Sequence, residues 1–318
     1  MSVYTTITPA EASAFLTRYS LPPLAALTAI RGGIENSNYF VLLDDGRELV
    51  LTLFEELSAA QAAFLGPLLA HLAGKGVRVA APLQDVRGRW LGTLAGKPAQ
   101  LAPRLAGTHP EQPDTAQCRA IGMALAQLHL ALADYPLQRV NAHGAVWWNE
   151  VVSRWRGRLA TEDAGLLEQT LRLHDEACQR HHDLPQGLIH GDLFRDNTLF
   201  KAGEVSAILD FSETGQDYWL LDMAITINDF CRAWPGDRPD PARCRAFIAG
   251  YEERRLLTDG EHGALPAFLA TAAMRFWLSR LDVQLRNREE QRSGEHVLEK
   301  DPAEMRELTR YRLQAACA

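Results

Sequence analysis

Three polar residues of types that bind metal ions and move protons, Asp192, Asn197 and Asp210, occur within one short stretch of the chain. Between Asn197 and Asp210 the residue types predict a hairpin, with an outgoing strand at 198–200 and a return strand at 205–209. Such a hairpin brings Asp210, at the end of the return strand, back beside Asn197, at the start of the outgoing strand. Asp192 lies in the loop just before the hairpin, so the three side chains are expected to face one cleft.

These residue types suit a divalent-cation site next to a carboxylate that can move a proton. Hard cations such as Mg²⁺ prefer carboxylate and amide oxygens, and they commonly share their coordination shell with phosphate. A separate carboxylate within reach of a substrate hydroxyl can accept or orient its proton. The hairpin therefore offers two oxygen ligands side by side and a third acid nearby.

The elements that must position these residues begin with a strand-rich region. In the first hundred residues, a capped helix is expected over 9–19, and strand formers occur within 30–43 and over 48–54. Apolar residues at helical spacing predict a helix over 58–72, and two or three more strands fit between 77 and 101. This region is expected to form a small, mainly antiparallel sheet with one helix packed on it.

The sequence after residue 103 is mainly helical. Helices are expected over 114–132, over 145–182 and, with an interruption, from 220 to about 312. Strands are expected only in the region around the hairpin. The predicted fold class is therefore α+β, with a small antiparallel sheet first and a larger, mainly α-helical part after it.

Length, charge and cysteine content narrow the class of protein. The chain has 318 residues, which suits two domains, expected at 1–103 and 104–318. Acids outnumber bases 40 to 33, and the net charge of −7 disfavours a nucleic-acid partner. Five cysteines without a C-x-x-C pair fit a reducing compartment. With no recognisable secretory signal or bilayer-spanning run, a cytoplasmic protein without a membrane partner is expected.

The segment His190–Asn197, H-G-D-L-F-R-D-N, followed by Asp210-Phe211, resembles the catalytic and metal-binding motifs of the aminoglycoside phosphotransferase and choline kinase group. The order of the sheet-rich and helical regions agrees with that group. The resemblance implies a protein-kinase-like two-lobed fold, a nucleotide-covering lobe followed by a catalytic lobe, and ATP and Mg²⁺ as cofactors. The segments 121–132 and 217–229 also resemble parts of the group's pattern.

Within this group, the pattern is most similar to the kinase-like homoserine kinase family, through segments 32–41, 49–55 and 274–281. This resemblance implies transfer of the ATP γ-phosphate to the side-chain hydroxyl of L-homoserine, giving O-phospho-L-homoserine for threonine biosynthesis, by a monomer or a homodimer. Two alternatives stay open. One is a kinase of another amino-alcohol or sugar, such as choline, an aminoglycoside or a methylthioribose-like sugar. The other is a nucleotide-binding pseudokinase that acts as a regulatory module.

The resemblance also implies roles for individual residues. Asp192 matches the base for the attacking hydroxyl, and Asn197 and Asp210 match the ligands of Mg²⁺. Arg195 is expected to reach the transferring phosphoryl group. Two further residues are expected to support the catalytic loop, namely His190, which braces it, and Asp222, which buttresses it.

A nucleotide site is implied in the first domain, although it departs from the pattern of kinases. Kinases grip the α- and β-phosphates with a lysine on the third strand, whereas this chain has Thr52 at that place and its next lysine is Lys75. Backbone N–H groups of the glycine loop are expected to carry more of this contact. Without a lysine partner, Glu55 and Glu56 are not assigned the role of the helix glutamate. The residues expected to contact the nucleotide are Gly32, Gly33, Asn36, Ser37, Asn38, Thr52 and Leu101.

Four residues are expected at the substrate, namely Asp217, Trp148, Arg275 and Arg280. Arg275 interrupts an apolar helix, so its charge requires either a substrate carboxylate or a structural salt bridge, and both readings stay open. Arg280 lies roughly 140° further around that helix, so the two arginines need not point to one place. Trp147 and Trp148 form an aromatic pair that either packs in the core or lines a pocket.

One histidine is expected to be structural. His129 lies on an apolar helix face, where a packed and hydrogen-bonded imidazole is favoured over a metal ligand.

Overall fold

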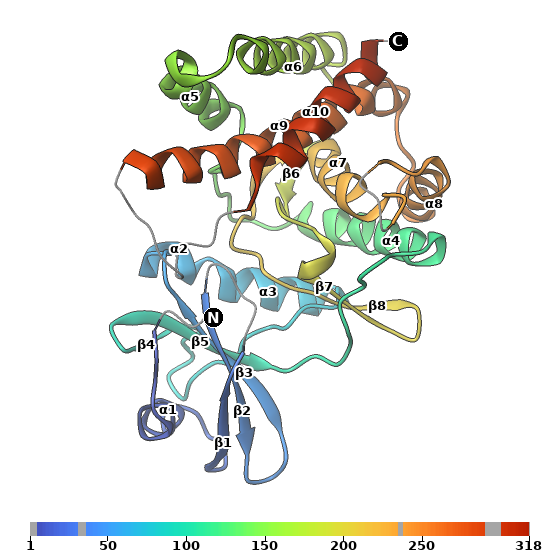
Figure 1. Ribbon diagram of the computed structural model, residues 1–318. Coiled ribbons are helices and arrows are strands. Elements are labelled where there is room, and N and C mark those ends of the chain that lie inside the picture. Colours follow the sequence, from blue (N-terminus) through green and yellow to red (C-terminus); the bar gives the residue numbers. More distant parts are fainter. Residues whose placement is uncertain (1–4, 31–35, 235–237, 290–299, 318) are drawn as a thin grey trace. The chain divides into compact units, whose positions relative to one another are not determined.

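The computed structural model describes residues 5–30, 36–234, 238–289 and 300–317. By its internal contacts the chain divides into two compact units (Figure 1). The N-terminal unit contains Met1–Gly107 and Ser206–Ser212, and the C-terminal unit contains Thr108–Val205 and Glu213–Ala318. Asp210 therefore belongs to the N-terminal unit, although it lies far along the chain. No helix in the described residues is both long and apolar enough to cross a membrane.

The N-terminal unit is built on a five-stranded antiparallel sheet with the strand order β1-β2-β3-β5-β4. Its strands are β1 (Leu24–Ala29), β2 (Asn36–Leu43), β3 (Glu48–Phe54), β4 (Gly92–Leu94) and β5 (Lys97–Pro103). The predicted strand at 48–54 is confirmed, and two strands lie in the region where two or three were expected. Strand β1 was not predicted, because its largely exposed sequence LAALTA shows neither alternation nor a run of large apolar residues.

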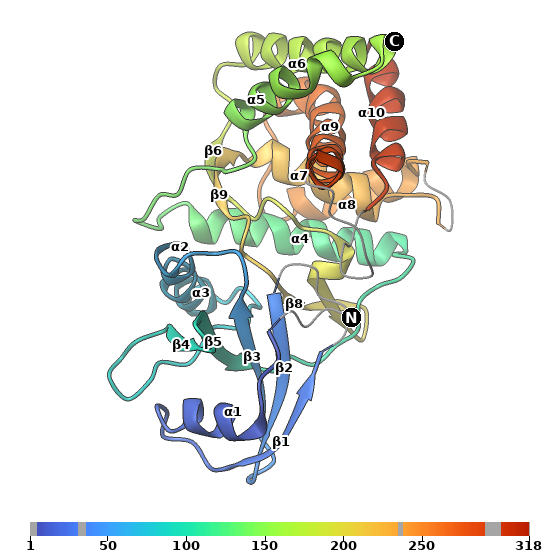
Figure 2. The same cartoon turned by 60° about the vertical axis from the view of Figure 1, so that its left-hand side comes forward.

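Helix α1 (Pro9–Leu16) covers one face of this sheet (Figure 2). Thr8 and Glu11 form the expected capping box at its start, and the helix ends three residues earlier than predicted. The helix expected over 58–72 is instead two helices, α2 (Ala59–Ala63) and α3 (Leu65–Gly74). Pro67 explains the break, because a proline has no N–H group to donate to the carbonyl four residues earlier.

The C-terminal unit is mainly helical, as predicted, and α9 is its central element. Helix α9 packs against α5, α6, α7 and α10, and α10 runs beside it in both views (Figure 1; Figure 2). The region expected to be helical over 145–182 contains two α-helices, separated by a short 3₁₀ turn. The helices are α4 (Thr115–Leu132), α5 (Ala145–Trp155), η1 (Arg156–Arg158), α6 (Thr161–Arg180), α7 (Trp219–Phe230), α8 (Pro241–Glu252), α9 (Asp259–Glu289) and α10 (Pro302–Cys317).

Two short sheets interrupt the helices. Strand β6 (Gln186–Ile189) pairs antiparallel with β9 (Gly215–Tyr218), and β7 (Thr198–Lys201) forms a sheet with β8 (Glu204–Ile208). The predicted hairpin is thus present. Strand β9 was not predicted, because its sequence GQDY has no apolar alternation. The pairing of β6 with β9 brings the segment after the hairpin back to the segment that precedes it.

Two glycines allow helices α4 and α8 to approach closely. A Cβ at Gly122 of α4 would lie 2.2 Å from the carbonyl oxygen of Phe247, and a Cβ at Gly250 of α8 would lie 2.1 Å from that of Arg119. Only a residue without a side chain fits at either position. This close approach brings Tyr251 of α8 to His129 of α4, a contact on which the site described below depends.

Candidate active site

The loop from His190 to Asn197, between β6 and β7, is held by the carboxylate of Asp222 in the first turn of α7. The backbone N–H groups of His190 and Gly191 donate to Asp222 oxygens over 2.8 and 2.9 Å. Asp222 is completely buried, as is His190, whose Nδ1 accepts a hydrogen bond from the N–H of Asp192 at 3.2 Å. Gly191 has φ +81°, a conformation that favours glycine. The loop therefore has its shape fixed on both sides of Gly191.

A chain of buried hydrogen bonds from helices α4 and α8 also holds Asp222. His129 Nε2 lies 3.0 Å from Asp222 Oδ2, and His129 Nδ1 lies 2.8 Å from the hydroxyl of Tyr251. Burial lowers the pKa of His129, so the ring is neutral. Because a carboxylate only accepts, Nε2 carries the proton and Nδ1 accepts from Tyr251. The expectation of a packed, hydrogen-bonded His129 is confirmed.

The charge on Asp222 follows from the same contacts. Burial alone raises the pKa of its carboxyl group, but the hydrogen bond from His129 and the loop N–H groups outweigh burial, and the pKa is lowered overall. A charged carboxylate is therefore present at the centre of the unit, as expected for a residue that holds the loop.

Asp192 and Asn197 are joined directly. The side-chain amide of Asn197 donates to the carbonyl oxygen of Asp192 at 2.9 Å and to its carboxylate Oδ2 at 3.0 Å. These two bonds fix the amide, so that its oxygen points away from Asp192. Both residues are half-buried. The arrangement leaves a carboxylate and an amide oxygen, side by side, at the surface of the C-terminal unit.

Arg195 makes its contacts within the C-terminal unit. Its Nη1 donates to the carbonyl of Glu111 at 2.9 Å, its guanidinium stacks 3.7 Å from the ring centroid of Trp234, and its backbone N–H donates to Asp229 at 2.8 Å. These contacts engage the side chain that was expected to reach the transferring phosphoryl group. Contact with the phosphoryl group stays a prediction.

Asp210, in the N-terminal unit, is exposed and adopts φ +54°, which is uncommon for a residue with a side chain. Its Oδ1 accepts hydrogen bonds from the N–H of Ser212 at 3.1 Å and from the Ser212 hydroxyl at 2.6 Å. The bonds to Ser212 fix the direction of the carboxylate. Its role as a metal ligand stays a prediction.

The residues expected at the nucleotide are only partly gathered on one face of the sheet. Gly32 and Gly33 lie outside the described residues. Thr52 donates to Asn38 Oδ1 at 2.7 Å on the neighbouring strand. Leu101, in contrast, is fully buried in the core under α1, and it pairs with Leu51 rather than with Thr52, so its side chain lies on the opposite face.

A lysine–glutamate pair in the N-terminal unit was missed by the sequence analysis. Lys97 Nζ lies 3.3 Å from Glu55 Oε2, although Glu55 was set aside for want of a lysine partner. The carboxylate of Glu55 also accepts from the hydroxyls of Ser37, at 2.6 Å, and of Thr5, at 3.0 Å. Burial opposes the charge, but these bonds lower the pKa of Glu55. Asn36, next to Ser37 at the start of β2, is also buried.

Beyond Asp210, the chain contributes an ionic cluster to the C-terminal unit. Glu213 Oε2 accepts a hydrogen bond from Arg275 Nη2 at 2.8 Å and lies in hydrogen-bond contact with His143 Nδ1. Arg275 therefore has the salt-bridge partner that its position demanded. Arg280 points elsewhere, to Glu304 at 2.7 Å. Sequence reasoning missed Glu213 and His143, which lie 70 positions apart.

The other two residues expected at the substrate are hydrogen-bonded within the C-terminal unit. Trp148 is 1% exposed, and its indole N–H donates to the carbonyl of His143 at 2.6 Å, which favours packing over contact with a substrate. Asp217 accepts from Asn141 Nδ2 at 2.7 Å, and burial raises the pKa of its carboxyl group. Trp147 is only half-buried, and its ring meets that of His143 edge-on at 4.7 Å between centroids.

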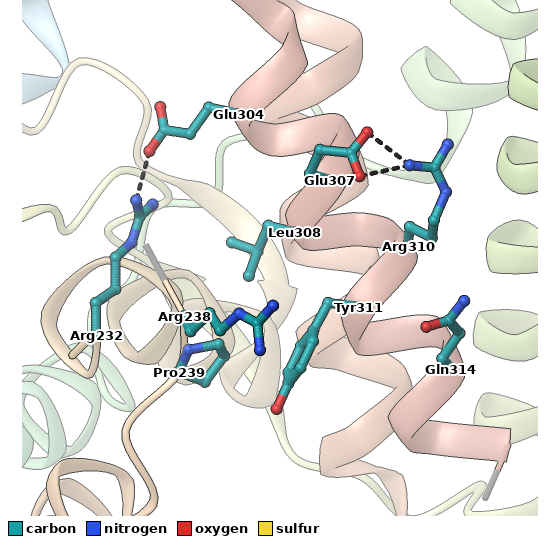
Figure 3. A pocket seen from close by; sticks show the side chains of 9 residues that line it. All are labelled: Arg232, Arg238, Pro239, Glu304, Glu307, Leu308, Arg310, Tyr311 and Gln314. Atoms are coloured by element: carbon teal, nitrogen blue, oxygen red, sulfur yellow. Dashed lines mark hydrogen bonds and ion pairs between the residues drawn. The ribbon is translucent and has the colours of Figure 1, made fainter. Parts of the chain in front are cut away.

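A separate cavity in the C-terminal unit is lined by none of the residues that the sequence predicted at the site (Figure 3). Its acidic side chains are paired within the cavity itself, Glu304 with Arg232 and Glu307 with Arg310. The residues lining it are Arg232, Arg238, Pro239, Glu304, Glu307, Leu308, Arg310, Tyr311 and Gln314. The catalytic loop, rather than this cavity, is therefore the candidate site.

This loop and fold define a phosphotransferase. The model of the phosphotransferase enzyme family matches residues 26–257, so the chain belongs to that family. It is 41% identical over 283 residues to homoserine kinase of Polaromonas naphthalenivorans, covering 88% of this chain and 89% of that protein. It is 39% identical to homoserine kinase of Neisseria meningitidis, covering 97% of this chain and 98% of that protein.

The fold is also similar to solved structures. A structure of amicoumacin kinase in complex with AMP-PNP, Ca²⁺ and Ami superposes with a TM-score of 0.68 at 19% identity, covering 96% of this chain and 92% of that one. The predicted α+β, kinase-like fold class is thereby confirmed. At this identity the likeness concerns the fold alone.

The first prediction concerns the carboxylate under the loop. In Asp222→Asn, an amide NH₂ group replaces one of two oxygens that both face N–H donors, so the variant is expected to lose about 2–4 kcal/mol of unfolding free energy. Urea denaturation measures this loss, and hydrogen exchange at the amides of His190 and Gly191 should accelerate. Asp175→Asn is the matched control, because Asp175 also faces a histidine but is 71% exposed. Equal stability of the two variants would contradict the assigned role.

Proposed function

We propose that this protein is a homoserine kinase, which transfers the γ-phosphoryl group of ATP to the side-chain hydroxyl of L-homoserine and forms O-phospho-L-homoserine for threonine biosynthesis. The observation that carries this proposal is similarity to homoserine kinases over nearly the whole of both chains. The Asp192–Asn197 pair supports the proposal, because it holds a carboxylate beside an amide on the loop between β6 and β7. An alcohol and ATP are the two substrates, and the five free cysteines fit a cytoplasmic setting.

Asp192 is the group that acts on the substrate hydroxyl. Its carboxylate accepts the hydroxyl proton as the oxygen attacks phosphorus, a contribution typically worth about 10²–10⁴-fold in rate. Asn197 holds one oxygen of this carboxylate and thereby orients the other. Most of the remaining acceleration in phosphoryl transfer comes from positioning and from neutralising charge.

Mg²⁺ fits the donors that these residues present. The oriented amide oxygen of Asn197 and the carboxylate of Asp210, fixed by Ser212, are the hard oxygen ligands that Mg²⁺ prefers. We assign both residues as its ligands. When bound, the ion would neutralise charge on the ATP phosphates.

We assign ATP to the N-terminal lobe, residues 1–103, and the alcohol to the catalytic lobe, residues 104–318. Thr52 carries no charge, and its hydroxyl is engaged with Asn38, so it does not replace the usual lysine as a cation. The bonds of Glu55 to Ser37 and Lys97 support the start of β2, directly after the glycine loop. Peptide N–H groups at this loop are the phosphate donors in this proposal.

Turnover with a panel of alcohols tests the proposal. ADP release under saturating Mg·ATP is expected with L-homoserine and not at comparable rates with choline, an aminoglycoside or methylthioribose. Faster turnover of another panel member would assign a different alcohol. ATP binding without turnover of any member would instead identify a regulatory module.

The role of Asp192 is tested separately. Asp192→Asn is expected to lower kcat for L-homoserine by about 10²–10⁴-fold, while the Kd for Mg·ATP changes little, because the variant removes the proton acceptor. Asp196→Asn is the control, since Asp196 lies in the same loop with a side chain that is 63% exposed. A loss of ATP affinity as large as the loss of kcat would refute the base role.

A further inference from the structure

The ionic cluster around Glu213 lies directly against the catalytic loop. A Cβ built on Gly191, the residue before Asp192, would lie 2.8 Å from the carbonyl oxygen of Glu213 and 3.4 Å from its Cβ. The cluster contacts the same loop a second time, because Phe276, next to Arg275, meets the ring of Phe194 edge-on with ring centroids 4.5 Å apart. The backbone of Glu213 is therefore in contact with the residue that precedes Asp192.

Glu213 keeps one oxygen free for a ligand. Both of its hydrogen bonds, to Arg275 and to His143, end on Oε2, and no described residue bonds to Oε1. The side chain of Glu213 is 19% exposed and that of His143 is 29% exposed. Burial opposes ionisation, but His143, Arg275 and Arg139 lower the pKa of Glu213 to about 2, so it is an anion near neutral pH. The anion is therefore partly exposed to solvent.

A cation with spare donors stands beside this anion. The Arg275 side chain is 7% exposed, and only its Nη2 is engaged with Glu213, with no other hydrogen bond to the side chain from the described residues. A guanidinium carries five N–H donors in a fork that matches a carboxylate. Its guanidinium lies over the ring of Phe276, with Cζ 3.9 Å from the ring centroid, and this contact helps to hold the side chain in place. The cluster thus presents both signs of charge close to Asp192.

We propose that Glu213 and Arg275 form the subsite for the zwitterionic head of an α-amino acid, with Glu213 Oε1 accepting from the ammonium group and the Arg275 fork donating to the carboxylate. His143 is a positioning residue that holds Glu213. This inference rests on the proposed function, since in L-homoserine two methylene groups separate the hydroxyl oxygen from the α-carbon. A substrate with only a positive charge would leave Arg275 without a second partner, so the subsite selects an amino acid over a simple amino-alcohol.

Binding of three small probes tests the subsite without requiring turnover. Each probe is titrated into the full chain in the presence of Mg·ADP, and binding is measured by NMR. L-2-Aminobutanoate carries both charges, butanoate lacks the ammonium group, and 1-aminopropane lacks the carboxylate. Glu213→Gln is expected to weaken L-2-aminobutanoate by about 10–100-fold and to leave butanoate within threefold, because only the former loses a charged hydrogen bond. Arg275→Lys should weaken L-2-aminobutanoate and butanoate but not 1-aminopropane.

Two control variants match these changes away from the cluster. Glu252→Gln alters a glutamate that also pairs with a histidine, His262 at 3.2 Å, and Arg286→Lys alters an exposed arginine of α9 that pairs with Asp282 at 3.0 Å. Both should leave all three affinities unchanged. If Glu213→Gln does not fold, Glu213→Asp keeps the charge, withdraws it by one methylene group, and should show the same selective loss.

The possible results distinguish the subsite from the proposed reaction. An equal loss for all three probes would show that the cluster is only a structural brace and would overturn the inference. Selective losses together with no turnover of L-homoserine would uphold the subsite and overturn the proposed reaction. Turnover of L-homoserine that Glu213→Gln and Arg275→Lys leave unchanged would uphold the reaction and overturn the subsite.

Discussion

The carboxylate of Asp222 is the constraint on which the candidate site depends. A buried charge is costly unless hydrogen bonds satisfy it. Asp222 meets this demand by accepting from two successive amides of the catalytic loop and from a neutral histidine. If the loop moved away, the buried carboxylate would lose two of its hydrogen-bond donors. Its geometry is therefore set by helix α7, a rigid element, although the loop itself carries the chemistry.

Two other features of the C-terminal unit follow from this anchoring. The glycine contacts between α4 and α8 bring Tyr251 to His129, which fixes the tautomer that donates to Asp222. On the other side, Gly191 lets the loop approach the backbone of Glu213. The same turn of the chain thus places a proton acceptor and an ionic cluster next to each other. In the proposed function, the loop anchored by Asp222 would then position both the group that acts on the substrate's hydroxyl and the groups that bind its charged head.

The sequence predicts the parts of this architecture that depend on local pattern. The helix expected over 114–132, the strand at 48–54, the hairpin after Asn197 and the packed His129 are confirmed, because each follows from neighbouring residues. The strands β1 and β9 were missed, since exposed or polar strands are defined by the partner with which they pair. The helix is divided at residue 64 because Pro67 has no N–H group to donate within an unbroken helix.

The missed site residues share a different cause. Glu55 with Lys97, and Glu213 with His143, are pairs of residues far apart in the chain, and no local spacing reveals them. Arg275 was recognised as a charge that needs a partner, yet its partner became visible only in three dimensions. Trp148 lies in the interior because helical position, rather than residue type, decides which of two adjacent tryptophans is buried. The position of the catalytic loop and its hairpin was thus predictable, while the partners that come from distant parts of the chain were not.

The central claim is that the protein attaches phosphate to the side-chain oxygen of L-homoserine. The most direct measurement is two-dimensional ¹H–³¹P NMR of the products formed from L-homoserine and Mg·ATP. The account predicts a new phosphate-ester signal that correlates with the γ-methylene protons of homoserine and grows in step with ADP. A reaction that yields only ADP and inorganic phosphate, or no new phosphorus signal, would contradict it.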